Sequence, residues 1–334
     1  MLSQTKIQEL MSKFAQVNVN QIKDKSLRAK AVKLKKKQAG FTLLELLVVV
    51  AILAAIAGTA TIALQDTDAR ASAAAHVAMM DELNKGIRTF RVLNKNSLPS
   101  NFDSLIEVAT DPTAGTALDG DLLGTSVAGS DILAIEDVAV VAINADVKGI
   151  LADGGIEALQ YVALDGDPEG EGTCADMQDL IADRGNAVVA GNIFMTPDGN
   201  GCGFSRTLED TDEVAIWTGG QERLTGQPAA TGVVEFDGSN AATATGKAFM
   251  AVGLGPASTL FNANDLGGMT SVPVYRHVSE TQYNRFIAVF DIGTFDGTGA
   301  IDAADQVVLV TIVDGAGDTK EEELGEWDGT RNTI

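Results

Sequence analysis

A basic segment followed by a long apolar run is the feature that most constrains this 334-residue chain. Residues 41–64 contain one charged side chain, Glu45, and three lysines precede the run at 35–37. As a helix these residues would extend about 36 Å at ~1.5 Å per residue, which exceeds the roughly 30 Å hydrocarbon core of a bilayer. We therefore predict a transmembrane helix over residues 41–64.

The balance of charge changes at the same boundary. Residues 1–40 carry ten Lys and Arg against two acidic residues, whereas the rest of the chain carries 14 basic and 44 acidic residues. A basic flank marks the cytoplasmic side of a membrane segment. We predict that residues 1–40 are a leader that is removed and that the acidic body is exported. Such a body would repel nucleic acid, so no direct nucleic-acid binding is expected.

The helical pattern continues beyond the apolar run. Apolar residues recur at spacings of three and four, and the first proline is Pro99. One helix is therefore predicted from Phe41 to about Asn94, apolar on all sides over 41–64 and amphipathic over 65–95. Its predicted buried stripe comprises Ala73, Val77, Met80, Leu83, Ile87 and Phe90.

Basic residues cluster near the end of this helix, at Lys85, Arg88, Arg91 and Lys95. At ~100° per residue they fall within roughly a third of the helix circumference. They fit either a solvated face that compensates the helix dipole or a strip that docks on the acidic body of a neighbouring subunit.

The remainder, residues 96–334, is predicted to be a β-rich globular body with acidic loops. A short helix is expected at 102–109, capped by Asn101. Strands are expected at "VVEF" (233–236) and in the later runs "YNRFIAVFDI" and "QVVLVTIV". Asp-Gly occurs eight times, and between alternating runs this dipeptide favours hairpins. The fold class is α+β, with the long helix packed on the body.

Two cysteines, Cys174 and Cys202, are the only ones in the chain. In an exported protein such a pair favours a disulfide, and closing a loop of this length is worth about 3–4 kcal/mol. Two free buried thiols are the alternative.

An acidic stretch, "DGDPEGEGTCAD" (165–176), has the spacing of a calcium loop. Asp165, Asp167, Glu169 and Asp176 occupy positions 1, 3, 5 and 12 of the EF-hand pattern. Ca²⁺ is the only cofactor that the sequence suggests; a solvated acidic loop is the alternative. "FDGTGAIDAAD" (295–305) is a weaker match to the same pattern.

Signals of enzymatic chemistry are missing from the sequence. There is no nucleophile elbow, zincin motif or P-loop. The two histidines are interpreted as a helix-face residue, His76, and a surface or satisfied core residue, His277. No catalytic residue is assigned, and we expect the protein not to be an enzyme.

The stretch "KKKQAGFTLLELLVVVAIL" resembles the N-terminus of type IV prepilins, a family shared with type II secretion pseudopilins. The resemblance implies cleavage between Gly40 and Phe41 by prepilin peptidase, N-methylation of Phe41, and a pilin-like fold. Glu45 matches the family's glutamate at the fifth position of the mature chain. The leader is longer than many in the family, and Ile62 stands in the region where the family commonly has a helix-weakening proline.

The resemblance also gives Glu45 a physical role. A carboxylate at the bilayer centre costs about 2.5–3.5 kcal/mol, and cleavage creates a cationic partner, the Phe41 amine. In a staggered bundle Glu45 of one subunit could meet this amine on the next and so fix register. The implied partners are other pilin or pseudopilin subunits, prepilin peptidase and an inner-membrane assembly platform. The precursor would reside in the inner membrane and the mature chain in a periplasmic or extracellular filament.

A second class of function stays open. Residues 35–64 could be an ordinary signal or anchor of a calcium-binding adhesin, since "AIAG" (55–58) offers a signal-peptidase site. The mature protein would then begin at Gly58, and its N-terminal sequence separates the two classes.

Overall fold

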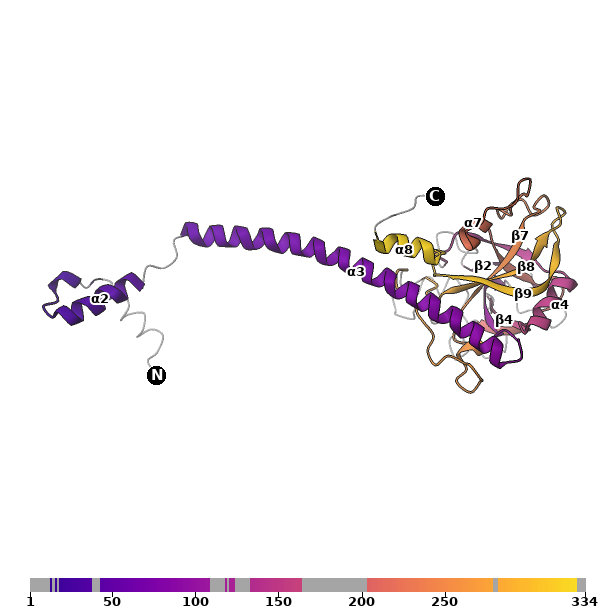
Figure 1. Cartoon of the computed structure of the whole chain (residues 1–334), viewed down its shortest axis with the longest axis horizontal. Helices are drawn as coiled ribbons and strands as arrows, with labels where there is room; N and C mark the ends of the chain where they lie inside the picture. The colour runs from indigo at the N-terminus through magenta and orange to yellow at the C-terminus, as the bar shows by residue number, and fades with distance from the viewer. Residues whose placement is uncertain are drawn as a thin grey trace. The chain divides into compact units, whose positions relative to one another are not determined.

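The computed structural model describes residues 13, 16, 18–37, 43–108, 118, 120–123, 133–163, 203–278 and 282–328. The chain divides into two compact units, residues 1–68 and 69–334. The described part is a mixed α/β structure with one sheet and several helices (Figure 1). The pilin-like arrangement of the whole chain stays a prediction.

The first unit contains the short turn η1 (Val19–Gln21), helix α2 (Lys25–Lys37) and the first part of α3 (Leu43–Leu93). Asp24 caps α2, since its Oδ1 accepts hydrogen bonds from the amides of Ser26 (2.7 Å) and Leu27 (3.3 Å). Hydrogen bonds from Ser26 hold the pKa of Asp24 below its usual value. The lysine-rich segment at 25–37 is therefore helical.

Helix α3 confirms the continuous helix predicted from Phe41 to about Asn94. Its buried stripe differs from the predicted one, because His76 is buried in place of Val77, which is half-buried. The chain leaves the helix through left-handed backbone at Lys95 (φ 56°) and Asn96 (φ 74°). The stripe comprises Ala73, His76, Met80, Leu83, Ile87 and Phe90.

The second unit is built on a nine-stranded sheet whose main path is β3-β6-β7-β1-β4-β5. Strand β2 pairs with β1, and the β8–β9 hairpin joins through β7. Only the β1–β4 pairing is parallel among the described strands. The strands are β1 (Phe102–Val108), β2 (Gly120–Leu122), β3 (Val138–Ala142), β4 (Ala158–Ala163), β5 (Gly203–Thr207), β6 (Glu213–Trp217), β7 (Lys247–Gly253), β8 (Ile287–Phe295) and β9 (Ile301–Val313).

Both faces of the sheet are covered. On β8, Phe290 and Ile292 belong to the core cluster that contains the α3 stripe, and Ile287 and Val289 belong to a second cluster. This alternation follows from the two-residue period of a strand. Helix α4 (Ala145–Gly154) joins the α3 side, and α7 (Gln221–Thr225) joins the other side.

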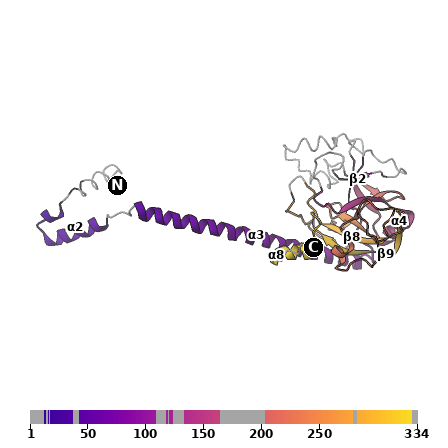
Figure 2. The same ribbon diagram turned by 90° about the horizontal axis from the view of Figure 1, so that it is seen from above.

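The remaining elements are the turn η3 (Thr259–Phe261) and the C-terminal helix α8 (Lys320–Asp328). Figures 1 and 2 both show α8 (yellow) beside α3. Lys320 of α8 contacts Asp81 of α3 through Nζ–Oδ1 and Nζ–Oδ2 distances of 2.6 and 2.8 Å. Helix α8 is therefore held against the long helix α3.

Two local predictions for the body are wrong, and the Asp-Gly hairpin prediction holds at one position among the described residues. Residues 102–109 do not form a helix, because 102–108 is strand β1, which is buried throughout between the two clusters. "VVEF" is not a strand: the amides of Thr245 and Gly246 both donate to the Val234 carbonyl, which leaves no regular ladder. Among the Asp-Gly pairs in the described residues, only Asp296-Gly297 joins two paired strands, β8 and β9.

Asp103 is one of the acidic side chains buried in the second unit. Asp103 on β1 is fully buried, and the Tyr283 hydroxyl donates to its Oδ2 at 2.8 Å. Burial raises the pKa of Asp103 to about 8 in spite of this hydrogen bond, so the carboxyl is protonated at neutral pH. The folded state therefore binds a proton that the unfolded chain releases near pH 4.

We predict that Asp103→Asn makes folding less sensitive to pH. The stability that Asp103 contributes is complete below about pH 4 and is lost as the pH rises to about 8, with a slope of up to about 1.4 kcal/mol per pH unit. Asn mimics the protonated acid, so the stability of the variant relative to wild type should increase across this range. Urea denaturation at several pH values measures this difference.

The matched control is Asp121→Asn, which changes an exposed residue of β2. Its stability should follow the wild-type pH profile. If the Asp103→Asn profile also runs parallel to wild type, Asp103 does not titrate in the way proposed.

Candidate functional site

The N-terminal signature lies across the start of α3. Glu45 is the third residue of that helix, and the lysines at 35–37 end α2. Gly40 and Phe41 lie outside the described residues, as does the side chain of Glu45. The predicted cleavage, methylation and charge pairing at these three residues therefore stay predictions.

Large aliphatic side chains are exposed along the beginning of α3. Their exposed fractions range from 45% for Val48 to 61% for Leu47. In water such a surface is unfavourable by about 25 cal/mol per Å² of apolar area, so it indicates a site that an apolar partner covers. The side chains are those of Leu46, Leu47, Val48, Val49, Val50, Ile52, Leu53 and Ile56.

No helix within the described part of the chain is both long and apolar enough to cross a membrane. The transmembrane helix predicted over residues 41–64 is not supported by this finding.

The predicted calcium loop and disulfide fall outside the described residues. Asp165, Asp167, Glu169 and Asp176 lie there, and so do Cys174 and Cys202. Both features remain predictions.

The weaker calcium pattern at 295–305 is a β-hairpin. The Asp296 carboxylate accepts hydrogen bonds from the Thr298 amide (2.7 Å), the Thr298 hydroxyl (2.6 Å) and the Ala300 amide (3.2 Å). Hydrogen bonds from Thr298 lower the pKa of Asp296. Asp302 and Asp305 belong to strand β9. Asp296 therefore stabilises the turn of the hairpin.

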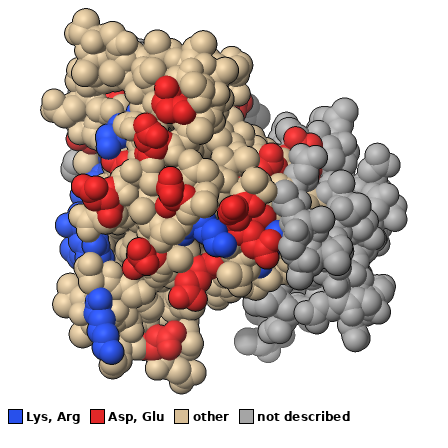
Figure 3. Space-filling model, turned by 90° about the vertical axis from the view of Figure 1, so that its right-hand side faces the viewer, with Lys and Arg blue, Asp and Glu red and all other residues tan. Residues whose placement is uncertain are grey.

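The predicted basic strip is split by the end of α3. Lys85 and Arg88 are exposed on the helix, and Arg88 Nε donates to Asn84 Oδ1 at 2.7 Å. Lys95 lies beyond the last helical residue and is also exposed. Figure 3 shows one face of the molecule, on which Lys and Arg lie along one margin and also nearer the centre, among acidic residues.

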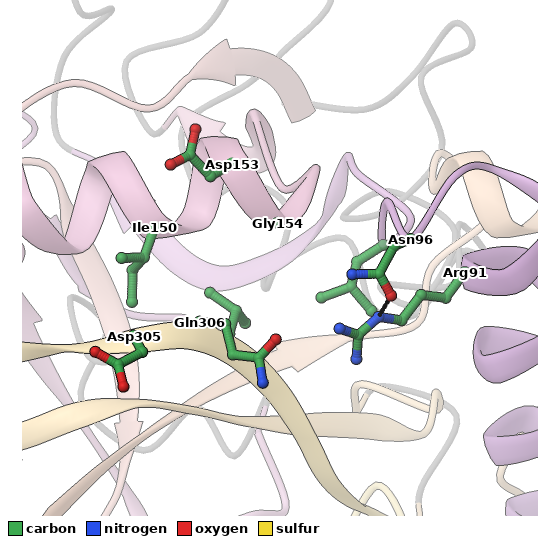
Figure 4. Close-up of a pocket in the computed structure, with 9 residues that line it drawn as sticks. Arg91, Asn96, Ile150, Asp153, Gly154, Asp305 and Gln306 are labelled. Atoms are coloured by element: carbon green, nitrogen blue, oxygen red, sulfur yellow. Dashed lines mark hydrogen bonds between the residues drawn. The ribbon is translucent and has the colours of Figure 1, made fainter.

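Arg91 lines a small cleft between the end of α3, α4 and β9 (Figure 4). Its Nε donates to Asn96 Oδ1 at 2.8 Å, and Asp153 and Asp305 stand at other sides of the cleft. The volume is about 80 Å³, whereas small-molecule sites occupy roughly 300–1,000 Å³. The cleft is too small for a metabolite.

A histidine–carboxylate cluster lies where α3 meets α8. His76 Nδ1 is 3.3 Å from Glu323 Oε1, and these residues are only 3% and 2% exposed. The His277 ring stands edge-on to that of His76, with centroids 4.4 Å apart. One ligand atom from each of the three residues lies within 4.8 Å of the other two. Residues from three separate parts of the chain thus share one site.

Tyr275 and Asp314 complete the surroundings of this cluster. The Tyr275 ring centroid is 4.7 Å from that of His76. Asp314, which follows β9, is fully buried. Its Oδ1 accepts from the amides of Ala316 (2.9 Å) and Asp318 (2.8 Å), but its Oδ2 and the Oε2 of Glu323 have no hydrogen-bond partner.

The electrostatics of the two carboxyls differ. Burial, reinforced by the neighbouring Glu323, raises the pKa of Asp314. Burial opposes ionisation of Glu323, but the hydrogen bond with His76, the neighbouring Asp314 and the charge of the two imidazoles together outweigh burial and keep the pKa of Glu323 below its ordinary value. Glu323 is therefore the ionised member of the pair.

Helix α8 is fixed from a second side. Arg223 of α7 donates from Nε to Glu322 Oε1 at 2.9 Å, and its guanidinium lies 5.2 Å from the Trp217 ring centroid. Because Glu322 and Glu323 are adjacent, this contact also restrains the position of Glu323.

The cluster was missed in the interpretation of the sequence. The sequence did contain one indication that His76 is buried. The buried residues of the stripe are separated alternately by three and four positions, and this spacing places residue 76, and not residue 77, on the buried face. No comparable signal marks His277, Glu323 or Asp314, because only the tertiary fold brings them to His76.

Comparison with known proteins bears on the N-terminal segment. Residues 35–61 match the family described as the prokaryotic N-terminal methylation motif. The chain thus carries the prepilin-type cleavage and methylation signature, which confirms the resemblance seen in the sequence. Comparisons with curated proteins and with solved structures found no match.

We predict that the His76–Glu323 contact is important for stability even without metal. His76→Ala leaves the Glu323 carboxylate buried and unpaired, so it should lower the free energy of unfolding by about 3–5 kcal/mol. Replacing both residues with leucine should recover at least half of this loss. Urea denaturation in the presence of a chelator measures both changes.

Lys320→Ala is the comparison within the same helix pair. The side chains of Lys320 and Asp81 are 41% and 45% exposed, so this change should cost no more than about 1 kcal/mol. An equally small effect of His76→Ala would show that the buried contact does not hold α8 on α3.

Proposed function

We propose that this protein is a structural, non-enzymatic subunit of a type IV pilus-like or type II secretion filament, assembled through α3 after prepilin peptidase cleavage. The observation that carries the proposal is the continuity of the signature with α3. Residues 35–61 match the methylation motif, and residues 43–61 of this segment belong to α3, which continues to Leu93. The methylation signature and the helical stripe that packs on the sheet thus both include parts of α3.

The exposed aliphatic side chains at 46–56 supply the assembly surface in this proposal. In the precursor, lipid would cover them, with the basic residues of α2 on the cytoplasmic side. In a filament the helices of neighbouring subunits would cover them instead. The inner-membrane assembly platform would provide the passage between these two states, and the mature chain would lie in the periplasm or outside the cell.

Glu45 then sets the register between subunits. Its carboxylate lies at the entrance of an apolar segment, and the cut at Gly40–Phe41 creates an amine four residues before it. Within an apolar bundle either charge alone is strongly unfavourable, so helices align where the two meet. Methylation of the Phe41 amine leaves its positive charge in place.

The second half of α3 has a different task. Its stripe from Ala73 to Phe90 is buried in the body, so the sheet and α4 are attached to it through packing. Subunits that bundle through residues before this stripe would carry their bodies on the outside of the filament.

The first test is the N-terminus of the mature protein. We expect mass spectrometry of the protein from its native host to find a chain that begins at N-methylated Phe41. Gly40→Val should leave the leader in place, because a side chain there obstructs the cut. A mature chain that begins at Gly58 would contradict the proposal and support an ordinary exported protein.

The second test concerns assembly. Glu45→Gln removes the charge partner while keeping shape, so we expect normal cleavage with at least about tenfold less assembled filament. Sheared filament and membrane fractions quantify the two forms. The control is Glu82→Gln, at an exposed position of the same helix, which should assemble like wild type. Equal assembly of the Glu45→Gln chain would exclude the register role.

A further inference from the structure

The histidine–carboxylate cluster offers more than a structural contact. Two imidazoles and one carboxylate converge from α3, from the loop before β8 and from α8, with ligand atoms within 4.8 Å of one another. Imidazole nitrogen and carboxylate oxygen together are the donor set of zinc and related divalent ions.

A separate observation points to a missing ligand. Glu323 Oε2 and Asp314 Oδ2 are buried without any hydrogen-bond partner. A buried oxygen without a hydrogen-bond partner lowers the stability of the fold by roughly 1–3 kcal/mol, and by more when it is charged. Two such oxygens therefore favour a bound group that compensates them. A divalent cation beside these two oxygens would compensate both of them.

We propose that His76, His277 and Glu323 bind one divalent ion of the zinc class, with the Asp314 carboxyl adjacent. This site goes beyond the filament role proposed above and does not depend on it. It is also distinct from the acidic stretch at 165–176, whose oxygen donors suit Ca²⁺.

The geometry requires little rearrangement. Zinc–ligand distances of about 2.0–2.2 Å in a tetrahedron place neighbouring ligand atoms about 3.3 Å apart. The His76 Nδ1–Glu323 Oε1 distance is already 3.3 Å. The adjustment falls on His277, which is exposed and lies in a segment without regular secondary structure. The fourth position would be taken by water or by Asp314.

The bound ion would fasten α3 to the C-terminal part of the body. His76 belongs to the buried stripe of α3, Glu323 to α8 and His277 to the loop that leads into β8. One ion would therefore join three elements that are otherwise held together by side-chain packing and by solvent-accessible pairs such as Lys320–Asp81. Its expected effect is a higher stability of the second unit.

The test is a Zn²⁺ titration of the full chain, purified in detergent and freed of metal with a chelator that is then removed. We expect one Zn²⁺ per chain and, at about a hundredfold excess over Kd, an unfolding midpoint raised by roughly 5–10 °C. Mg²⁺ should not reproduce the shift, because it prefers oxygen ligands. Co²⁺ serves as a spectroscopic probe, whose visible absorption reports imidazole ligation.

His277→Ala is the decisive variant, because an exposed loop residue can be removed without unfolding the metal-free protein. It should weaken Zn²⁺ binding at least about tenfold and abolish the Co²⁺ band, while leaving the metal-free midpoint within about 2 °C of wild type. Glu323→Gln should weaken binding similarly, and Glu321→Gln, at an exposed position of the same helix, should bind like wild type.

Cys174 and Cys202 are the other residues that could hold zinc, so the titration is repeated with both changed to serine. Zinc binding that survives this double change but is lost in His277→Ala supports the proposed site. Binding that is lost with the cysteines, unchanged in His277→Ala, or absent from the wild-type chain overturns it.

Discussion

The burial of one stripe of α3 against the sheet is the interaction on which the rest of the second unit depends. Side chains from Met80 to Phe90 enter the same core as alternate residues of β7 and β8. Each large aliphatic or aromatic side chain buried in this way contributes about 1.5–3 kcal/mol. The stripe also fixes the rotation of α3, and that rotation directs His76 toward Glu323.

The same helix presents two different surfaces along its length. Residues 46–56 expose large aliphatic side chains, whereas the later stripe is covered by the body. A helix that was amphipathic throughout could bury its apolar face within its own chain. The first part of α3 instead exposes large aliphatic side chains, which is the physical basis for proposing an external partner.

The sequence predicted α3 because its apolar spacing persists over many turns without a proline. It did not predict β1, since a short apolar run buried on both faces has no period that separates strand from helix. The methylation signature could be recognised in the sequence because its residues are contiguous. The histidine–carboxylate cluster was not, because His277, Asp314 and Glu323 are distant from His76 in sequence and meet it only after the sheet has formed.

The position of α8 beside α3 has a mechanical consequence. A pull that separates α3 from α8 would have to break both the His76–Glu323 and the Lys320–Asp81 contacts. The load would pass from the beginning of the body directly to its last helix and reach the sheet from both. In the proposed filament, tension on α3 would thus be shared between the core of the body and α8.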